Sequence, residues 1–243
     1  RNAQKSGHIL TLEDPIEFVF RNRKSIVNQR EVGTDTKVFQ TALRNALRQA
    51  PDCILIGEIR DRETMTSALQ YAQSGHLCLA TLHANNSYHC MNRIISFYPL
   101  ENRPTLLLDL SASLQSIISQ RLVRTKTGAR RAAVEVLMNT RLISELIGKG
   151  EISEIKDAME KSMAPGSQTF EQSLFKLFSD GVISKDEALA NADSATNMLW
   201  LINQATAGQM TSNPAPSSKT ESKETVFAST AGGDTSFDEI KIS

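Results

Sequence analysis

The sequence predicts an α/β fold, in which a buried parallel sheet is followed by a helical region. Three short apolar runs, at residues 8–12, 53–56 and 77–82, are each bounded by glycine or polar residues. Runs of this length are typical of fully buried strands in parallel sheets. Stretches with helical periodicity separate them, as parallel strands require. Few aromatic residues and many aliphatic ones suit the same class.

The composition narrows the class of protein. Among 243 residues, 27 Lys and Arg balance 27 Asp and Glu, so net charge gives no reason to expect nucleic acid or an anionic membrane as a partner. Cys53, Cys78 and Cys90 are isolated, which predicts neither disulfides nor a zinc site and favours a reducing compartment. No apolar stretch reaches membrane-spanning length. Because the sequence starts at Arg1, we expect an N-terminal part to be missing.

The region after the first expected strand is mixed. Pro15 ends that strand, and residues 18–20 and 25–29 are predicted as short strands around a basic turn. Residues 34–36 offer capping oxygens for a helix at 38–47.

Helices dominate the rest of the chain. Asp61 is placed to cap a helix at 62–73, which Gly75 would end. An apolar face that runs from Leu107 to Ile118 predicts a long helix at 104–122. Further helices are expected at 88–97, 141–147, 152–159, 170–178 and 185–191, a last helix ending near 199–201, and a strand at 131–138.

These elements predict three parts. Residues 1–139 would form the α/β core that contains the three main strands, and residues 140–206 a helical C-terminal subdomain. Residues 207–243 have too few apolar side chains to offset the entropy cost of ordering, so we expect a disordered tail.

Polar side chains follow each of the three main strands. Because the carboxyl ends of parallel strands share one edge of a sheet, these side chains are expected to converge there. Carboxylates that hold hydrated Mg²⁺ and polarise a water, with cations that absorb phosphoryl charge, suit phosphoryl transfer. The candidates are Glu13, Asp14 and Glu17, then Glu58 and Asp61, then Thr81 and His83, with Arg44 and Arg48 on one face of the helix at 38–47.

Two histidines bracket the third strand. A fully extended strand would place the imidazoles of His76 and His83 roughly 23 Å apart, so they could not share one metal. A structural hydrogen-bonding role is the alternative for each.

In combination, these motifs resemble the secretion-type hexameric ATPases. Residues 11–17 (TLEDPIE) resemble the acidic Asp box of that family, residues 50–61 (APDCILIGEIRD) its atypical Walker B motif, and residues 75–83 (GHLCLATLH) its His box. Order and spacing match as well, over about residues 1–205. Residues 125–130 stand where secretion and pilus-extension members carry a four-cysteine zinc insert, so the chain resembles the type IV pilus retraction (twitching motility) ATPases. Residues 141–148 depart from the motif that the main retraction motor carries at this position. The chain therefore resembles the accessory retraction motor more than the main one.

The resemblance implies a RecA-like ATPase domain that binds ATP and Mg²⁺ between the subunits of a ring. The ring would be a homo-hexamer or a mixed ring with a paralogous retraction ATPase. It would be cytoplasmic and peripheral at the inner membrane, where it would bind an inner-membrane pilus platform protein. The resemblance also assigns Glu58 the Walker B role on Mg²⁺ and the attacking water, with Glu13 beside Glu58. His76 and His83 would link nucleotide state to subunit position.

One family motif is absent from these residues. No G-x-x-x-x-G-K-[ST] phosphate loop occurs in the sequence, and the family places that loop upstream of the Asp box. The core is therefore expected to be incomplete, and the fragment alone inactive. The alternatives are a non-catalytic accessory or regulatory subunit that assembles with a paralogous motor ring, and a related type II secretion ATPase.

Overall fold

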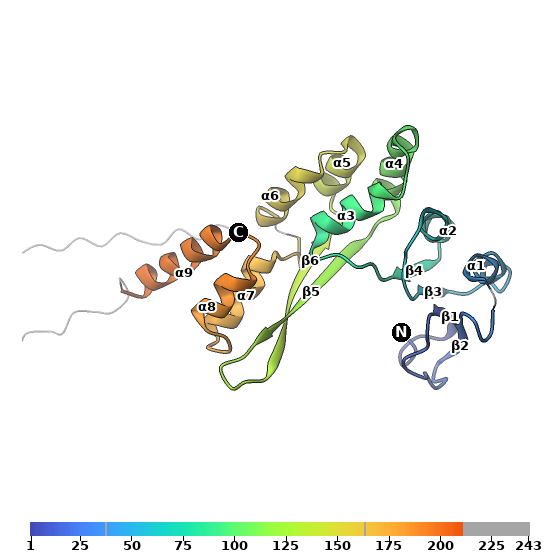
Figure 1. The fold of residues 1–243 in the computed structure, drawn as a ribbon, viewed down its shortest axis with the longest axis horizontal. Helices are drawn as coiled ribbons and strands as arrows, with labels where there is room; N and C mark the ends of the chain where they lie inside the picture. Colours follow the sequence, from blue (N-terminus) through green and yellow to red (C-terminus); the bar gives the residue numbers. More distant parts are fainter. Residues whose placement is uncertain (37, 163, 211–243) are drawn as a thin grey trace, which may run out of the picture. The chain divides into compact units, whose positions relative to one another are not determined.

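The predicted α/β class is confirmed by the structure, a computed structural model that describes residues 1–36, 38–162 and 164–210. The chain divides into two units, residues 1–204 and 205–243. The first unit contains a four-stranded sheet with the order β2-β1-β3-β4, in which every neighbouring pair is parallel (Figure 1). Its strands are β1 (Gly7–Glu13), β2 (Ser25–Glu31), β3 (Cys53–Ile56) and β4 (Leu77–Ala80).

One face of this sheet is buried. In the central strands β1 and β3, Leu10 lies beside Ile54 and Leu12 beside Ile56, and all four side chains are 0% exposed. The same core includes apolar residues of α1 (Phe39–Leu47) and α2 (Arg62–Gln73). The two helices are also joined by a hydrogen bond from the Tyr71 hydroxyl to the Leu43 carbonyl.

The sheet is followed by helices and a hairpin. The strands β5 (Ser116–Arg124) and β6 (Arg130–Met138) pair in antiparallel register, with Arg124 opposite Arg130. The helices are α3 (Ser87–Ser96), η1 (Leu100–Asn102), α4 (Arg103–Ser113), α5 (Arg141–Lys149), η2 (Ile152–Glu154), α6 (Ile155–Glu160), α7 (Phe170–Ser179), α8 (Lys185–Asn191) and α9 (Ala195–Met210). No helix among the described residues is long and apolar enough to cross a membrane.

The predicted long helix at 104–122 is wrong. Helix α4 ends at Ser113, because Leu114 takes extended backbone angles (φ −61°, ψ 135°) and strand β5 begins two residues later. Along β5 the side chains alternate, so that Val123 is buried and Leu122 is 61% exposed. Pairing with β6 therefore overrides the helical spacing of the apolar residues.

Two predictions near β2 are also wrong. Residues 18–20 are not a strand: they form a loop held by the side chain of Gln29, which accepts from Phe20 N at 2.7 Å and donates to Phe18 O at 2.8 Å. Residues 34–36 do not cap α1, which begins after Val38 without a side-chain cap. Asp35 instead accepts a hydrogen bond from Glu31 N at 2.8 Å, within the turn after β2.

The other expected strands and helices are confirmed, with differences in length. Strand β4 ends at Ala80, so the predicted strand at 77–82 is two residues shorter. Helix α9 continues past 199–201 and past the expected start of the tail at 207. The rest of the predicted tail, residues 211–243, lies outside the described residues. The division between 1–139 and 140–206 stays a prediction, since one apolar core includes residues from both ranges.

Candidate functional site

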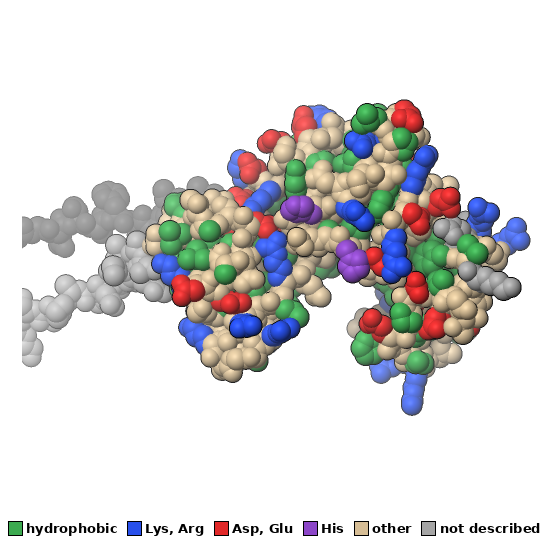
Figure 2. Space-filling model, viewed as in Figure 1, with side chains coloured by type: hydrophobic (Ala, Val, Ile, Leu, Met, Phe, Trp, Pro, Cys, Tyr) green, Lys and Arg blue, Asp and Glu red, His purple; other side chains and the backbone are tan. Residues whose placement is uncertain are grey.

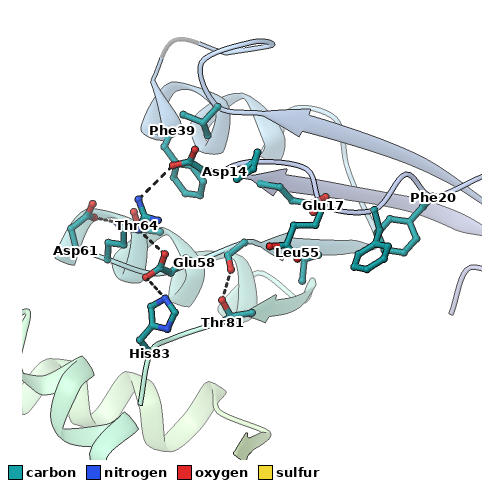
Figure 3. A pocket seen from close by; sticks show the side chains of 16 residues that line it. Asp14, Glu17, Phe20, Phe39, Leu55, Glu58, Asp61, Thr64, Thr81 and His83 are labelled. Atoms are coloured by element: carbon teal, nitrogen blue, oxygen red, sulfur yellow. Dashed lines mark hydrogen bonds and ion pairs between the residues drawn. The ribbon is translucent and has the colours of Figure 1, made fainter. Parts of the chain in front are cut away.

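A cleft of about 530 Å³ opens where β1 and β3 end and where the chain leaves β4 (Figure 3). The structure brings together here seven of the predicted site residues, one group from each strand end. Its walls also include Arg60, Gly57, Thr64 and several apolar side chains, among them Phe18, Phe20 and Phe39. The predicted residues in the cleft are Glu13, Asp14, Glu17, Glu58, Asp61, Thr81 and His83.

Glu58 forms the centre of the charged wall. Its Oε2 accepts a hydrogen bond from Arg60 Nε at 2.6 Å, and its Oε1 lies 3.2 Å from His83 Nε2. Arg60 also pairs with Asp14 at 3.5 Å, so one guanidinium bridges carboxylates from two strand ends. The hydrogen bond and the charge of Glu58 raise the pKa of Arg60 above its ordinary value. Glu58 is 23% exposed, which leaves it accessible to a ligand in the cleft.

Glu13 is the corresponding carboxylate at the end of β1. Its Oε1 accepts two hydrogen bonds, from Thr11 Oγ1 at 2.7 Å and from Gln29 Nε2 at 3.0 Å. Because both donors belong to strands β1 and β2, the side chain is fixed by the sheet itself. The segment after β4 is connected to the end of β3 by the Thr81 hydroxyl, which donates a hydrogen bond to the Gly57 carbonyl.

Gly57 allows β1 and β3 to end close together. Its N–H donates to Leu12 O at 2.7 Å. A Cβ at this position would lie 2.9 Å from Leu12 O and 3.2 Å from Glu13 Cα, too close for a side chain without backbone movement. The glycine that ends the apolar run thereby sets the approach of Glu13 to Glu58.

Asp61 has a structural task in the cleft wall. Its Oδ1 accepts a hydrogen bond from Thr64 N at 2.8 Å and caps helix α2, as the sequence predicts. Gly75, with φ +92°, follows the end of the same helix, again as expected. A role for Asp61 toward a metal stays a prediction.

Three predicted site residues do not reach the cleft. His76 is bound elsewhere, with its Nδ1 3.0 Å from Ser74 Oγ and its ring edge-on to Tyr71 at 6.1 Å between centroids. Arg44 on α1 and Arg48 directly after that helix are exposed and do not line the cleft. Of the two histidines that bracket β4, only His83 lies at the cleft. The roles predicted for His76, Arg44 and Arg48 stay predictions.

The donor set fits a magnesium ion that arrives with a phosphate ligand. Among the residues that the structure describes, no group of three or more His, Cys, Asp or Glu side chains could hold a metal alone. Mg²⁺ commonly binds through one or two carboxylates together with substrate phosphates and water, and Glu13 and Glu58 can supply such oxygens. Burial raises the pKa of Cys53 above its ordinary value and that of Cys78 and of Cys90 to about 11, so these thiols keep their protons at neutral pH.

The sequence places Arg60 at the end of the second strand, but no role in the site was predicted for it. The available signal was its position two residues after Glu58, because alternate side chains of an extended segment point to the same side. The contribution of Phe18 and Phe20 had no such signal, since the loop that carries them is folded by contacts with β2.

Comparison with known proteins places this cleft in context. Residues 2–177 match the family model described as Type II/IV secretion system protein. The chain is 50% identical to the type IV pilus ATPase PilU of Pseudomonas aeruginosa, over 83% of this chain and 53% of PilU. It is 42% identical to the type IV pilus retraction ATPase PilT of the same organism, over 81% of this chain and 57% of PilT. The chain thus spans about half the length of the curated relatives it matches.

A solved structure agrees with these relatives. The crystal structure of the pilus retraction motor PilT with bound ADP matches 81% of this chain and 55% of its own, with a TM-score of 0.75 and 43% identity. These similarities confirm the predicted resemblance to the type IV pilus retraction ATPases. The higher identity to PilU agrees with the prediction that the chain lies nearer to one retraction paralogue than to the other.

Proposed function

Since the chain belongs to the type II/IV secretion system protein family, we propose that the whole protein is an ATP-hydrolysing motor subunit that powers type IV pilus retraction and twitching motility. The observation that carries the proposal is the convergence of Glu13, Glu58 and His83 on one cleft, each from a different strand end. The names of the relatives, a pilus ATPase and a pilus retraction ATPase, support the biological role.

Glu58 is the proposed catalytic carboxylate. Each of its oxygens has two lone pairs, so it can accept a proton from an attacking water while it keeps its bonds to Arg60 and His83. His83 would orient the carboxylate, and Glu13 would stand beside it toward the metal. Magnesium bound here would neutralise charge on the phosphate oxygens. Arg60 is a further cation at the cleft, already paired with both acidic strand ends.

The remaining parts of the proposal concern the whole protein. A loop that cradles phosphates through its backbone N–H groups is needed for tight ATP binding. We place that loop in the part of the protein that these residues do not include. The motor would act as a homo-hexamer or in a mixed ring with a paralogous retraction ATPase. It would work in the cytoplasm at the inner membrane, against an inner-membrane pilus platform protein.

A Glu58→Gln variant of the whole protein tests this proposal. Gln keeps the shape of the side chain and removes the base, so ATP should still bind while turnover falls by about a hundredfold or more. Phosphate release measures turnover, and fluorescent-nucleotide titration measures binding. Glu63→Gln, an exposed acid in the first turn of α2, is the matched control and should change neither. Unchanged turnover in Glu58→Gln would remove Glu58 from the chemistry.

The absence of a phosphate loop from the sequence also keeps a second function in consideration, that of a non-catalytic accessory subunit. The whole protein with Glu58 intact distinguishes the two. ATP turnover by the purified protein alone supports the motor, whereas turnover that requires an added paralogue and survives Glu58→Gln supports the accessory subunit.

A further inference from the structure

The 81–86 segment joins β4 to α3, and its first half is held at the cleft. The Thr81 hydroxyl donates to Gly57 O, and Thr81 O accepts from Ile59 N at 3.0 Å. Two residues later, His83 meets Glu58 at 3.2 Å. The side chain of His83 is 90% exposed, so packing does little to fix it. Its position therefore depends on the backbone that carries it.

The second half of the segment is held by different elements. Asn85 O accepts from Arg121 Nη2 at 3.2 Å, and Asn86 Nδ2 donates to Asp193 Oδ2 at 3.0 Å. The next residue, Ser87, donates its N–H to the buried Glu135 at 2.6 Å. Five peptide steps separate Thr81 from Asn86, at most about 17 Å of chain, so only a short segment connects the two anchors.

Arg121 connects this anchor to the C-terminal helices. Its guanidinium donates to Asn85 O, donates to Asn191 O at 2.7 Å and pairs with Asp193. The same group stacks on the ring of Phe170, with 4.0 Å from Cζ to the ring centroid. The side chains of Arg121 and Asp193 are only 22% and 16% exposed, so solvent screens this ion pair less than it would screen a pair on the surface. A planar guanidinium distributes its donors over these separate acceptors while its face lies on the ring, whereas an ammonium offers all its donors from a single nitrogen.

We propose that Arg121 and Asp193 are positioning residues for ATP hydrolysis, a proposal that rests on the proposed function. They hold the 81–86 segment so that His83 stays against Glu58, and they connect that contact to the turn between α8 and α9. Neither residue lines the cleft. Their effect on the reaction therefore passes through His83, and this route gives a specific test.

A double-mutant cycle in the whole protein supplies the test. Arg121→Lys should lower kcat on the order of tenfold and change KM for ATP by less than about twofold, because the nucleotide contacts are untouched. In a His83→Ala background, the same substitution should change kcat by less than about twofold. Arg141→Lys is the matched control: its side chain is 94% exposed and pairs only along α5 with Glu145, so all values should stay unchanged.

The kcat values of the cycle and the hydrogen exchange of the 81–86 segment together separate the possible outcomes. Hydrogen exchange of the 81–86 segment should quicken in Arg121→Lys, and this readout is independent of activity. Equal losses of kcat with and without His83, no effect of His83→Ala itself, or unchanged exchange would each overturn the positioning role. If Arg121→Lys fails to fold, Asp193→Asn enters the same cycle, because it keeps the size of the side chain, retains one of the two accepting oxygens and removes the charge. Loss of the proposed function is recognised separately, by turnover that survives Glu58→Gln.

Discussion

Replacing Gly57 by alanine should separate the two strand ends that carry the acidic residues. The added Cβ would lie 2.9 Å from Leu12 O, and because that atom is backbone, no side chain can move aside. Overpacking of this kind costs about 1–3 kcal/mol. The hydrogen bond from Gly57 N to Leu12 O, 2.7 Å long, would weaken and add roughly 1 kcal/mol. The free energy of unfolding should thus fall by about 2–4 kcal/mol.

Thermal unfolding followed by circular dichroism measures this effect. For a unit of about 200 residues, the loss corresponds to a Tm lower by roughly 4–15 °C. In the whole protein, ATP turnover should fall as well, since Glu13 and Glu58 no longer approach each other as closely.

Gly148→Ala is the matched control. Its Cβ would meet only the Ser111 side chain, at 3.6 Å to Oγ and 3.8 Å to Cβ, which is ordinary contact. Within helix α5, alanine is favoured over glycine by up to about 1 kcal/mol, so Tm should stay the same or rise. Equal Tm values for Gly57→Ala and the wild type would refute the close approach of β1 and β3 at this point.

Two further predictions concern single carboxylates. Asp61→Ala should lower stability by about 1 kcal/mol in urea unfolding through loss of the α2 cap, whereas Asp61→Asn, which caps equally well, should not; equal losses would exclude the cap as the cause. Burial raises the pKa of Glu135 above its ordinary 4.5, so the folded state holds that proton more tightly than the unfolded state. The contribution of this group to stability is therefore present below 4.5 and is lost as pH rises through the raised value. Glu135→Gln should flatten the part of the stability curve that begins near pH 4.5 and extends upward, and parallel curves for the two proteins would contradict it.

The sheet and the cleft were predictable because their signals are local. Each central strand is an apolar run that ends in glycine or acid, and parallel pairing then brings Glu13 and Glu58 to one edge without further information. Hairpin β5–β6 was only half predicted. Ile117 and Ile118 continue a helical pattern along the chain, and only the long-range pairing with β6 makes them a strand.

Two further features of the site could not be predicted from local patterns. His76 is drawn to Ser74 and Tyr71, contacts that depend on where α2 ends. Arg121 carries no motif of its own, and its partners Asn85 and Asp193 are 36 and 72 residues away in sequence. Local patterns reveal which residues are capable of chemistry, whereas the residues that position them are defined by tertiary contacts.

The proposed function requires one magnesium–nucleotide complex to bind where the three strand ends meet. An experimental structure of the whole protein with Mg²⁺ and a non-hydrolysable ATP analogue tests it most directly. We expect the metal and the terminal phosphate in the cleft beside Glu58 and Glu13, with His83 still against Glu58. A nucleotide bound elsewhere, with this cleft empty or filled by protein, would contradict it.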